Sequence, residues 1–231
     1  MTEMTDNAVV FDNVRFCYDE VCAVRNISFS IPEKSIIAVI GPNGGGKSTV
    51  LKILSGLLKA DKGKVGIKKN YKVGYVSQFS DFDLTFPITV MDMVMSGTLC
   101  QRVRPFCRYT NEHRTKTLDS IRRVGLRGYE KRGINQLSGG ELKRAVIARV
   151  LASDADIIVL DEPDSSLDVD AARELYNILV ELKKDKTILI ASHHMSEVLD
   201  ISDKVLYIKS DSRMFDSPSE VKKMLGGGIV L

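Results

Sequence analysis

The sequence lacks the marks of membrane-spanning and secreted proteins. No apolar run in its 231 residues approaches the about 18 residues that a transmembrane helix needs. The first residues, MTEMTDNAVVFD, contain neither the basic region nor the apolar region of a signal peptide. The net charge of +3 is too small to indicate nucleic acid binding, and we expect no nucleic acid partner. We therefore expect an intracellular chain that does not itself cross a membrane.

Cysteine patterns typical of metal sites are also missing. Cys17, Cys22, Cys100 and Cys107 show no C-x-x-C spacing and have no nearby histidine partners. We expect four reduced thiols, as in proteins of the cytosol, rather than a disulfide or zinc framework.

The apolar pattern, in contrast, is informative. Residues 8–18 and 23–31 alternate apolar and polar side chains, which is typical of half-buried antiparallel strands. Residues 35–40, 156–162 and 186–193 are continuous apolar runs, as expected of strands that are covered on both faces. Further strands are predicted at 71–78 and in a hairpin over 204–216, and helices at 47–58, 111–126, 170–184 and after Pro218. Strands that alternate with helices predict an α/β fold with a parallel core.

A glycine-rich segment, GPNGGGKST, joins the first apolar run to the helix that follows. It matches the phosphate-binding pattern G-x-x-x-x-G-K-S/T in the strand–loop–helix context that this pattern requires. Its backbone N–H groups would wrap phosphates, Lys47 would reach the β- and γ-phosphates, and the Ser48 hydroxyl would bind Mg²⁺. The expected ATP-binding residues here are Gly41, Pro42, Asn43, Gly44, Gly45, Gly46, Lys47, Ser48 and Thr49.

Two carboxylates end the second apolar run. Asp161 stands where it could hold Mg²⁺, and Glu162 is a candidate general base for an attacking water. Three other residues are also candidates: His193 closes the next run, Gln78 ends a predicted strand, and Tyr18 could stack on a base. Each of these three also has an ordinary structural explanation, as a loop residue or as packing.

The segment LSGGE opens another helix in an unusual way. Ser138 and Glu141 form an S-x-x-E capping box, yet Gly139 and Gly140 stand between them. A glycine inside a helix costs roughly 0.5–1 kcal/mol relative to alanine. Either an anion approaches this helix end closely, or the segment is an ordinary capped helix.

Together and in this order, these motifs resemble the ATP-binding-cassette ATPases over nearly the whole chain. The Walker A motif is 41–49, the Q-loop centres on Gln78, the signature is 137–141, Walker B is 157–162, the D-loop is 165–168 and the switch histidine is His193. The resemblance implies a P-loop NTPase (RecA-like) core, with an antiparallel β subdomain and an inserted helical subdomain. The single domain would divide into a core formed by 1–86 and 151–231, and helices over 87–150.

The resemblance also implies how the motifs work. Two chains would pack head to tail around ATP and Mg²⁺, so that the signature of one chain caps the γ-phosphate held by Lys47 of the other. Tyr18 would stack on adenine. In catalysis, Gln78 would sense the γ-phosphate and the water, Glu162 would activate that water, and His193 with Asp168 would align the closed dimer. The implied signature residues are Leu137, Ser138, Gly139, Gly140 and Glu141; Ser165 and Asp168 belong to the D-loop; and Ser48, Gln78 and Asp161 bind Mg²⁺.

Three positions depart from the family pattern. Glu141 replaces the commoner glutamine, Asp164 replaces threonine after Asp-Glu-Pro, and His194 replaces aspartate. We expect these departures to affect rates and partners rather than activity, since none contacts a group assigned to chemistry.

The segment DLTFPITVMDMVMSG, residues 83–97, is similar to the segment after the Q-loop in ATPases of manganese, zinc and iron(II) importers. It implies an ATPase that docks on a separate membrane permease at the cytoplasmic face of the cell membrane, served by an extracytoplasmic solute-binding protein. Importers of metal chelates (siderophores, haem, cobalamin) carry a similar segment. A soluble iron–sulfur assembly ATPase, which is also a short single cassette, is a further alternative.

Charge is uneven along the chain. Residues 101–133 hold ten Arg and Lys against three Asp and Glu. This excess is typical either of a solvated helical face or of a surface that meets lipid headgroups or an acidic partner.

Overall fold

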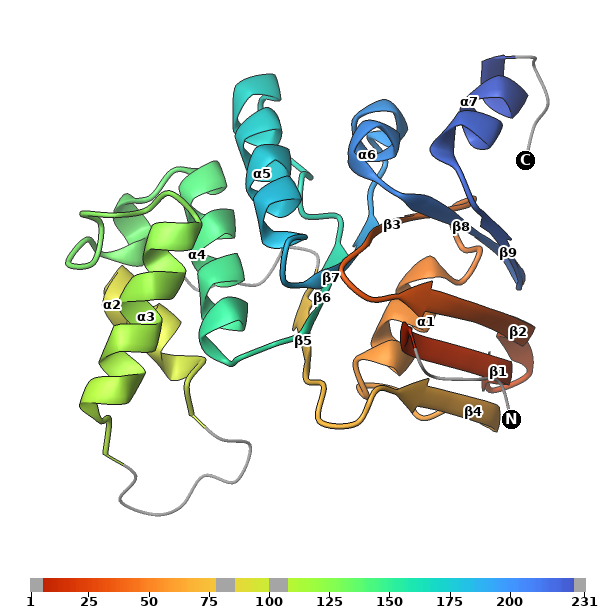
Figure 1. Ribbon diagram of the computed structural model, residues 1–231, viewed down its shortest axis with the longest axis horizontal. Coiled ribbons are helices and arrows are strands. Elements are labelled where there is room, and N and C mark those ends of the chain that lie inside the picture. Colours follow the sequence, from red (N-terminus) through yellow and green to blue (C-terminus); the bar gives the residue numbers. More distant parts are fainter. Residues whose placement is uncertain (1–5, 78–85, 100–107, 227–231) are drawn as a thin grey trace.

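Two β-sheets organise the chain. The computed structural model describes residues 6–77, 86–99 and 108–226 (Figure 1). The smaller sheet has the order β2-β1-β4 and is antiparallel; its strands are β1 (Asn7–Tyr18), β2 (Val21–Pro32) and β4 (Lys62–Ile67). The two strands expected from alternation are therefore confirmed. The sequence analysis missed β4, because KGKVGI is mostly charged or glycine and shows no apolar alternation.

The larger sheet has the order β5-β6-β7-β3-β8-β9. Its strands are β3 (Ile36–Ile40), β5 (Val73–Val76), β6 (Ile157–Asp161), β7 (Thr187–Ala191), β8 (Lys204–Lys209) and β9 (Asp211–Phe215). All neighbours pair in parallel except β8 and β9, which form the expected hairpin. The carboxyl ends of β3, β6 and β7 therefore meet at one edge, where open α/β sheets bind their ligands.

Continuous apolar runs form the central strands because both faces of the sheet are covered. In β3, Ile36, Ala38 and Ile40 belong to one hydrophobic cluster, whereas Ile37 and Val39 belong to another. Helix α1 (Lys47–Leu54) and the antiparallel sheet cover the second face (Figure 1). Helices α5 (Val169–Leu182), α6 (Met195–Ile201) and α7 (Pro218–Gly226) contribute to the first cluster.

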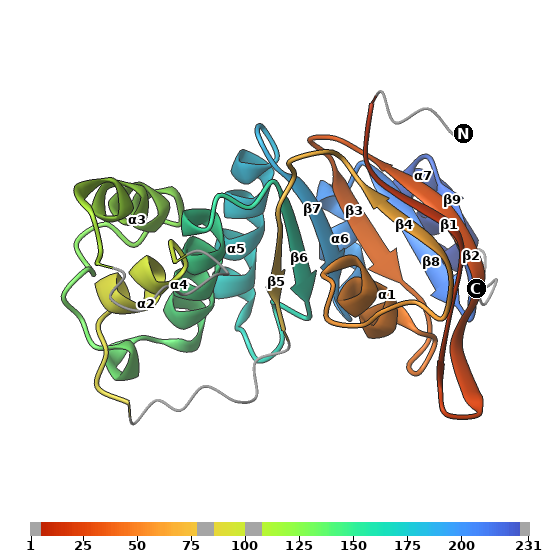
Figure 2. The ribbon, with the colours of Figure 1, turned by 90° about the horizontal axis from the view of Figure 1, so that it is seen from below.

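Three helices lie at one end of the molecule. They are α2 (Val90–Ser96), α3 (Asn111–Arg123) and α4 (Gly139–Ala152), with a short 3₁₀ turn, η1 (Ile134–Gln136), before α4 (Figures 1 and 2). Their buried side chains, such as Met93, Ile121 and Ala145, share the hydrophobic cluster that also contains Ile36. The helical pattern expected over this stretch is confirmed in its described part. Among the described residues, we find no helix with both the length and the apolarity to cross a membrane.

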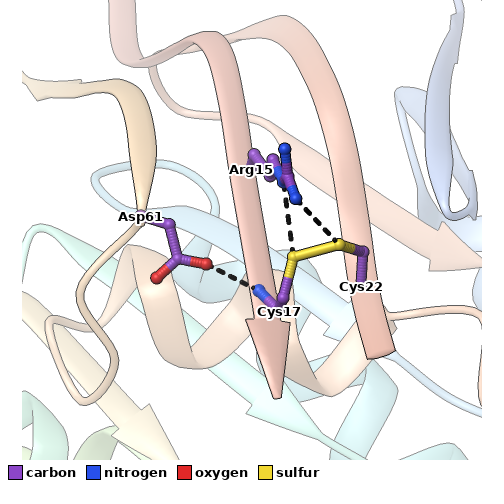
Figure 3. The surroundings of a disulfide bond; sticks show 4 residues. All are labelled: Arg15, Cys17, Cys22 and Asp61. Atoms are coloured by element: carbon purple, nitrogen blue, oxygen red, sulfur yellow. Dashed lines mark hydrogen bonds between the residues drawn. A yellow bond between two sulfur atoms is a disulfide. The ribbon is translucent and has the colours of Figure 1, made fainter. Parts of the chain in front are cut away.

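The β1–β2 hairpin contains a disulfide (Figure 3). Cys17 lies opposite Cys22 in the strand register, and their sulfurs are bonded. The Arg15 guanidinium donates to both sulfurs, at 3.3 and 3.4 Å, and the Cys17 backbone N–H donates to the Asp61 carboxylate at 2.8 Å. The expectation of reduced thiols was wrong for this pair, because the tight turn brings together residues whose spacing resembles no known motif. Cysteine usage therefore gives no argument for a reducing compartment. Cys100 and Cys107 lie outside the described residues.

Candidate nucleotide-binding site

The glycine-rich loop joins β3 to α1 and packs tightly against the backbone of β8 and β2. A Cβ on Gly41 would lie 2.0 Å from the Ile208 carbonyl oxygen, and one on Gly46 would lie 2.5 Å from the Ala23 carbonyl oxygen. Both glycines also have positive φ angles, 146° and 101°. A Cβ on Gly44, in contrast, would meet no atom within 4 Å. The loop is therefore fixed by β8 and β2 on one side and open on the other, where its backbone could receive a phosphate chain.

Lys47 places a cation inside this loop. Its ammonium group donates to the backbone oxygens of Gly41 at 2.9 Å and Pro42 at 3.0 Å. Burial lowers the pKa of Lys47, while the negative charges of Glu162 and Asp161 act to raise it. The ammonium group is therefore held over the loop, where it can pair with an anion.

Ser48 and Asp161 form an oxygen pair beside the loop. The Ser48 hydroxyl donates to Asp161 Oδ1 at 3.2 Å, and the Tyr75 hydroxyl donates to Oδ2 at 3.0 Å. Burial, then the Asp161 charge, raises the pKa of Tyr75, so Tyr75 remains a donor. Hydroxyl and carboxylate oxygens are the ligands that Mg²⁺ prefers, and Mg²⁺ usually needs few of them because phosphates and water complete its shell. The pair fits such an ion, and the described residues contain no group of three or more His, Cys, Asp or Glu that could hold a metal without a substrate.

Glu162 and His193 are brought together at the same sheet edge. His193 Nε2 lies 2.8 Å from Glu162 Oε1. Glu162 has a left-handed backbone conformation (φ 53°), and its N–H donates to the Ala191 carbonyl oxygen at 2.7 Å, which ties the ends of β6 and β7 together. A carboxylate in contact with an imidazole can accept a proton from water, with the imidazole orienting the carboxylate.

The signature segment is capped as predicted. Ser138 Oγ accepts from the Glu141 N–H at 3.3 Å, and Glu141 Oε2 accepts from the Ser138 N–H at 2.7 Å. This second bond is the main reason that the pKa of Glu141 lies below its usual value. Helices α4 and α1 lie on opposite sides of β5 and β6 (Figures 1 and 2), so the fold does not bring the signature to the loop of its own chain.

The two signature glycines differ in their surroundings. A Cβ on Gly139 would meet only Leu167 Cδ2, at 4.0 Å, whereas one on Gly140 would lie 3.1 Å from Ala171 Cβ. Packing within the described chain therefore explains a small residue at Gly140 but not at Gly139. Leu137, the remaining apolar residue of the signature, is partly buried against the core.

The remaining residues predicted to belong to the site lie in β1, in the D-loop and outside the described residues. Tyr18 ends β1 with 48% of its surface exposed, and its ring packs edge-to-face on Phe16. In the D-loop, Asp168 caps α5 by accepting from the Ala171 N–H at 2.8 Å, and Ser165 accepts from the Lys143 ammonium group. Gln78 lies outside the described residues.

The sequence analysis did not connect three residues near the site, Tyr75, Asp164 and His194, with the chemistry of the site. Tyr75 was missed because nothing in its strand pattern marks it as a partner of Asp161. Asp164 and His194 were noted only as departures from a family pattern, yet His194 Nδ1 lies 3.8 Å from Asp164 Oδ2. The sequence carries this signal only as two unusual residues, Asp164 and His194, that stand thirty positions apart.

The chain resembles known proteins over most of its length. The manganese transport system ATP-binding protein MntB of Bacillus subtilis is 36% identical over 207 residues, which cover 87% of this chain and 82% of MntB. The zinc uptake system ATP-binding protein ZurA of Listeria innocua is 34% identical over 214 residues, which cover 85% of this chain and 83% of ZurA.

Solved structures agree with these relatives. A metal-chelate type ABC transporter in an inward-facing conformation aligns with a TM-score of 0.83 at 27% identity, over 94% of this chain and 85% of that chain. A bacterial ABC transporter cassette solved as a dimer aligns with a TM-score of 0.72 at 26% identity, over 90% of this chain and 98% of that chain. The sequence model of the ABC transporter family matches residues 24–165, more than half of the chain. With the loop, the carboxylates and the capped signature helix described above, these matches show that the chain belongs to the ABC transporter family, as one of its ATP-hydrolysing cassettes.

Proposed function

We propose that this cassette powers the uptake of a divalent metal ion, which is zinc, manganese or iron, through a separate membrane permease. The observation that carries the proposal is the similarity to MntB and ZurA over most of both lengths, since these relatives serve manganese and zinc transport. The segment 83–97, with its similarity to the same group of importers, is a second support from the sequence.

The proposed site follows from the contacts at the sheet edge. The loop 41–49 binds the phosphates of ATP, with Lys47 as its cation, and Tyr18 stacks on adenine. Ser48 and Asp161, with Gln78, hold Mg²⁺, which when bound neutralises the phosphate charge. Glu162 accepts a proton from the attacking water, and His193 keeps the Glu162 carboxylate oriented. The 2.8 Å contact between these two side chains supports this division of roles.

We also propose that the working site forms between two copies of the chain. The signature residues Leu137, Ser138, Gly139, Gly140 and Glu141 of one copy would contact the γ-phosphate bound by the other, with Ser165 and Asp168 at the same interface. Two observations support the dimer. A similar cassette was solved as a dimer, and a Cβ on Gly139 would come no closer than 4.0 Å to any atom in the described part of its own chain. In this proposal residues 87–150 form the helical subdomain that carries the signature, and 1–86 with 151–231 form the nucleotide-binding core.

The proposed setting is the cytoplasmic face of the cell membrane. There the chain would dock on the permease, while a solute-binding protein delivers the ion on the other side. Support comes from the similar cassettes of whole transporters, the inward-facing metal-chelate type among them.

The cargo is tested by elemental analysis of cells that lack this protein. Manganese, zinc and iron are measured together after growth in metal-poor medium, with wild type or Glu162→Gln supplied back. We expect one metal to fall and only the wild type to restore it. Unchanged levels of all three metals would contradict the import of a free metal ion.

A metal-chelate importer is the second candidate, because one of the similar structures is a metal-chelate type transporter. The same cells distinguish the two proposals when iron is supplied either as a free salt or bound to a siderophore. A growth defect with the siderophore alone, with all free-metal uptake intact, would favour the second candidate.

The site is tested with the purified chain. We expect Glu162→Gln to bind MgATP, to lose at least about 100-fold in turnover and to form a dimer that light scattering detects. Lys47→Ala should lose most nucleotide binding, because the loop then lacks its cation. Near-normal turnover by Glu162→Gln would remove Glu162 from the role of general base.

A further inference from the structure

A buried carboxylate lies behind the Glu162–His193 pair. Asp164 is only 2% exposed, although it follows β6 by three residues. It accepts hydrogen bonds from the Tyr176 hydroxyl of α5 and from the Ser192 hydroxyl that follows β7. Burial, then the hydrogen bond to Asp164, raises the pKa of Tyr176, which therefore keeps its proton and remains a donor. A buried carboxylate is costly unless such partners satisfy it, so the position of Asp164 is closely defined.

Ser192 links this carboxylate to the residues on either side of His193. The Ser192 hydroxyl donates to Asp164 and at the same time accepts from the His194 backbone N–H at 2.9 Å. His193 stands between these two residues in the chain, so both of its neighbours are fixed by one chain of hydrogen bonds. These bonds fix the backbone on both sides of His193, whose Nε2 lies 2.8 Å from Glu162 Oε1.

Residue 194 reaches the same carboxylate with its side chain. His194 Nδ1 lies 3.8 Å from Asp164 Oδ2. The two departures from the family pattern, Asp164 for threonine and His194 for aspartate, are therefore neighbours in space. A carboxylate at position 194 would therefore lie beside the place that the Asp164 carboxylate occupies.

Asp164 also has a buried cation nearby on α4. Lys143 is 5% exposed; burial lowers its pKa and the charge of Asp164 raises it. The Lys143 ammonium group donates to the Ser165 carbonyl oxygen, directly after Asp164 in the chain. The segment that carries Asp164 is thus held from α4, α5 and β7 together.

From these contacts we infer that Asp164 is a positioning residue for ATP hydrolysis, which acts through Ser192 to hold His193 against Glu162. The inference rests on the proposed roles of Glu162 and His193. The contacts of Asp164 described above run to Tyr176, Ser192 and His194 and not to the phosphate-binding loop, so its loss should change the rate of the chemical step and leave ATP binding intact.

The test exchanges the carboxylate between the two positions in the purified full-length chain. Asp164→Thr should lower kcat by at least about tenfold, with the KM for MgATP within about twofold of wild type. Adding His194→Asp to Asp164→Thr returns a carboxylate from the other side and should restore kcat to within about threefold of wild type. A general loss of packing would not be rescued in this way.

Tyr176→Phe is the matched control. It removes a hydrogen bond to Asp164 Oδ2, the same oxygen that accepts from Ser192, but it leaves in place the Ser192 hydroxyl and its bond to the His194 N–H. It should lower the midpoint of thermal unfolding and leave kcat within about twofold of wild type.

If Asp164→Thr does not fold, Ser192→Ala tests whether the hydrogen bond between Asp164 and Ser192 supports catalysis. It should lower kcat as Asp164→Thr does, and the double variant should fall no further than about twofold below the worse single variant, because both act through one bond. Wild-type kcat in a folded Asp164→Thr or in Ser192→Ala would overturn the inference, as would equal losses of kcat in Tyr176→Phe and Ser192→Ala. Glu162→Gln is measured in parallel. If Glu162→Gln keeps its turnover, the proposed catalytic role of Glu162 is wrong. If Glu162→Gln loses turnover while the Asp164 and Ser192 variants do not, only the inference about Asp164 is wrong.

Discussion

The protein begins two helices with glycine-rich segments, and the surroundings of the two are opposite. At α1 the loop is walled by its own chain, because a Cβ on Gly41 or Gly46 would collide with backbone oxygens of Ile208 or Ala23. At α4 the space over Gly139 holds no atom of the described chain closer than 4.0 Å. Glycine is therefore required at α1 by the fold itself, while at Gly139 it is required, under the proposed function, by a second molecule.

The two helix N-termini also differ in whether side chains accept hydrogen bonds from their backbone N–H groups. Helix α1 has Gly46 at its N-cap, with no side chain to bond them, so they are available to an anion. Helix α4 has a complete capping box between Ser138 and Glu141, so part of its end is already satisfied. A helix that is stable without a ligand can present its end to a partner, whereas the α1 loop depends on β8 and β2 for its shape.

The largest effect is expected at Gly41. Gly41→Ala should lower the free energy of unfolding by at least about 3 kcal/mol, because the new Cβ meets the Ile208 carbonyl and the φ angle of 146° is unfavourable for alanine. Urea unfolding without nucleotide measures this. Gly44→Ala, at a positive φ but with open space around it, is the control and should cost only about 1–2 kcal/mol. Equal losses in the free energy of unfolding at Gly41 and Gly44 would contradict a destabilising clash between the new Cβ and the Ile208 carbonyl.

The opposite result is expected at Gly139. Gly139→Ala should leave the isolated chain as stable as wild type, or stabilise it by roughly 0.5–1 kcal/mol, because alanine is the better helix former. Turnover and MgATP-dependent dimerisation should fall by about tenfold, while ATP binding to the single chain stays unchanged. Light scattering and steady-state kinetics measure both. Full turnover with normal dimerisation would leave this glycine unexplained and weaken the proposed head-to-tail site.

The smallest effect concerns the cap of α4. The pKa of Glu141 is below its usual value in the folded chain, so its contribution is present above the unfolded pKa and is lost as pH falls through the folded pKa. Glu141→Gln should therefore lower the free energy of unfolding by roughly 0.3–1 kcal/mol at pH 7 and by less near pH 4. Unfolding curves at the two pH values test it. A difference that grows on acidification would contradict the sign of the pKa shift.

The sequence marks the groups that we propose bind and react more clearly than it marks the groups around them. Lys47, Asp161 and Glu162 were found because a short motif carries each of them, and His193 because it ends a buried strand. Tyr75 and Ser192 were missed, since hydroxyl groups in or after a strand are ordinary in a sequence and gain meaning only from their neighbours. Asp164 was noticed and then judged unimportant for chemistry, because its contacts run through the residue beside His193.

Two details of the fold were not predicted, for a similar reason, although the fold class was. Strand β4 has no apolar pattern of its own and exists because β1 offers an edge to pair with. The disulfide depends on the register that puts Cys17 opposite Cys22. In both cases a partner far along the chain, or across a turn, decides the outcome.

The sequence by itself determined the family, the parallel core, the phosphate loop and the capping box of α4. These features rest on local chemistry: apolar runs that need cover on both faces, glycines where the backbone must be bare, and side chains that bond their own helix end. The tertiary structure alone decided that Cys17 and Cys22 are bonded and that Asp164 and His194 lie side by side. These depend on strand order and register, which bring distant residues within a few ångströms and which no local pattern encodes.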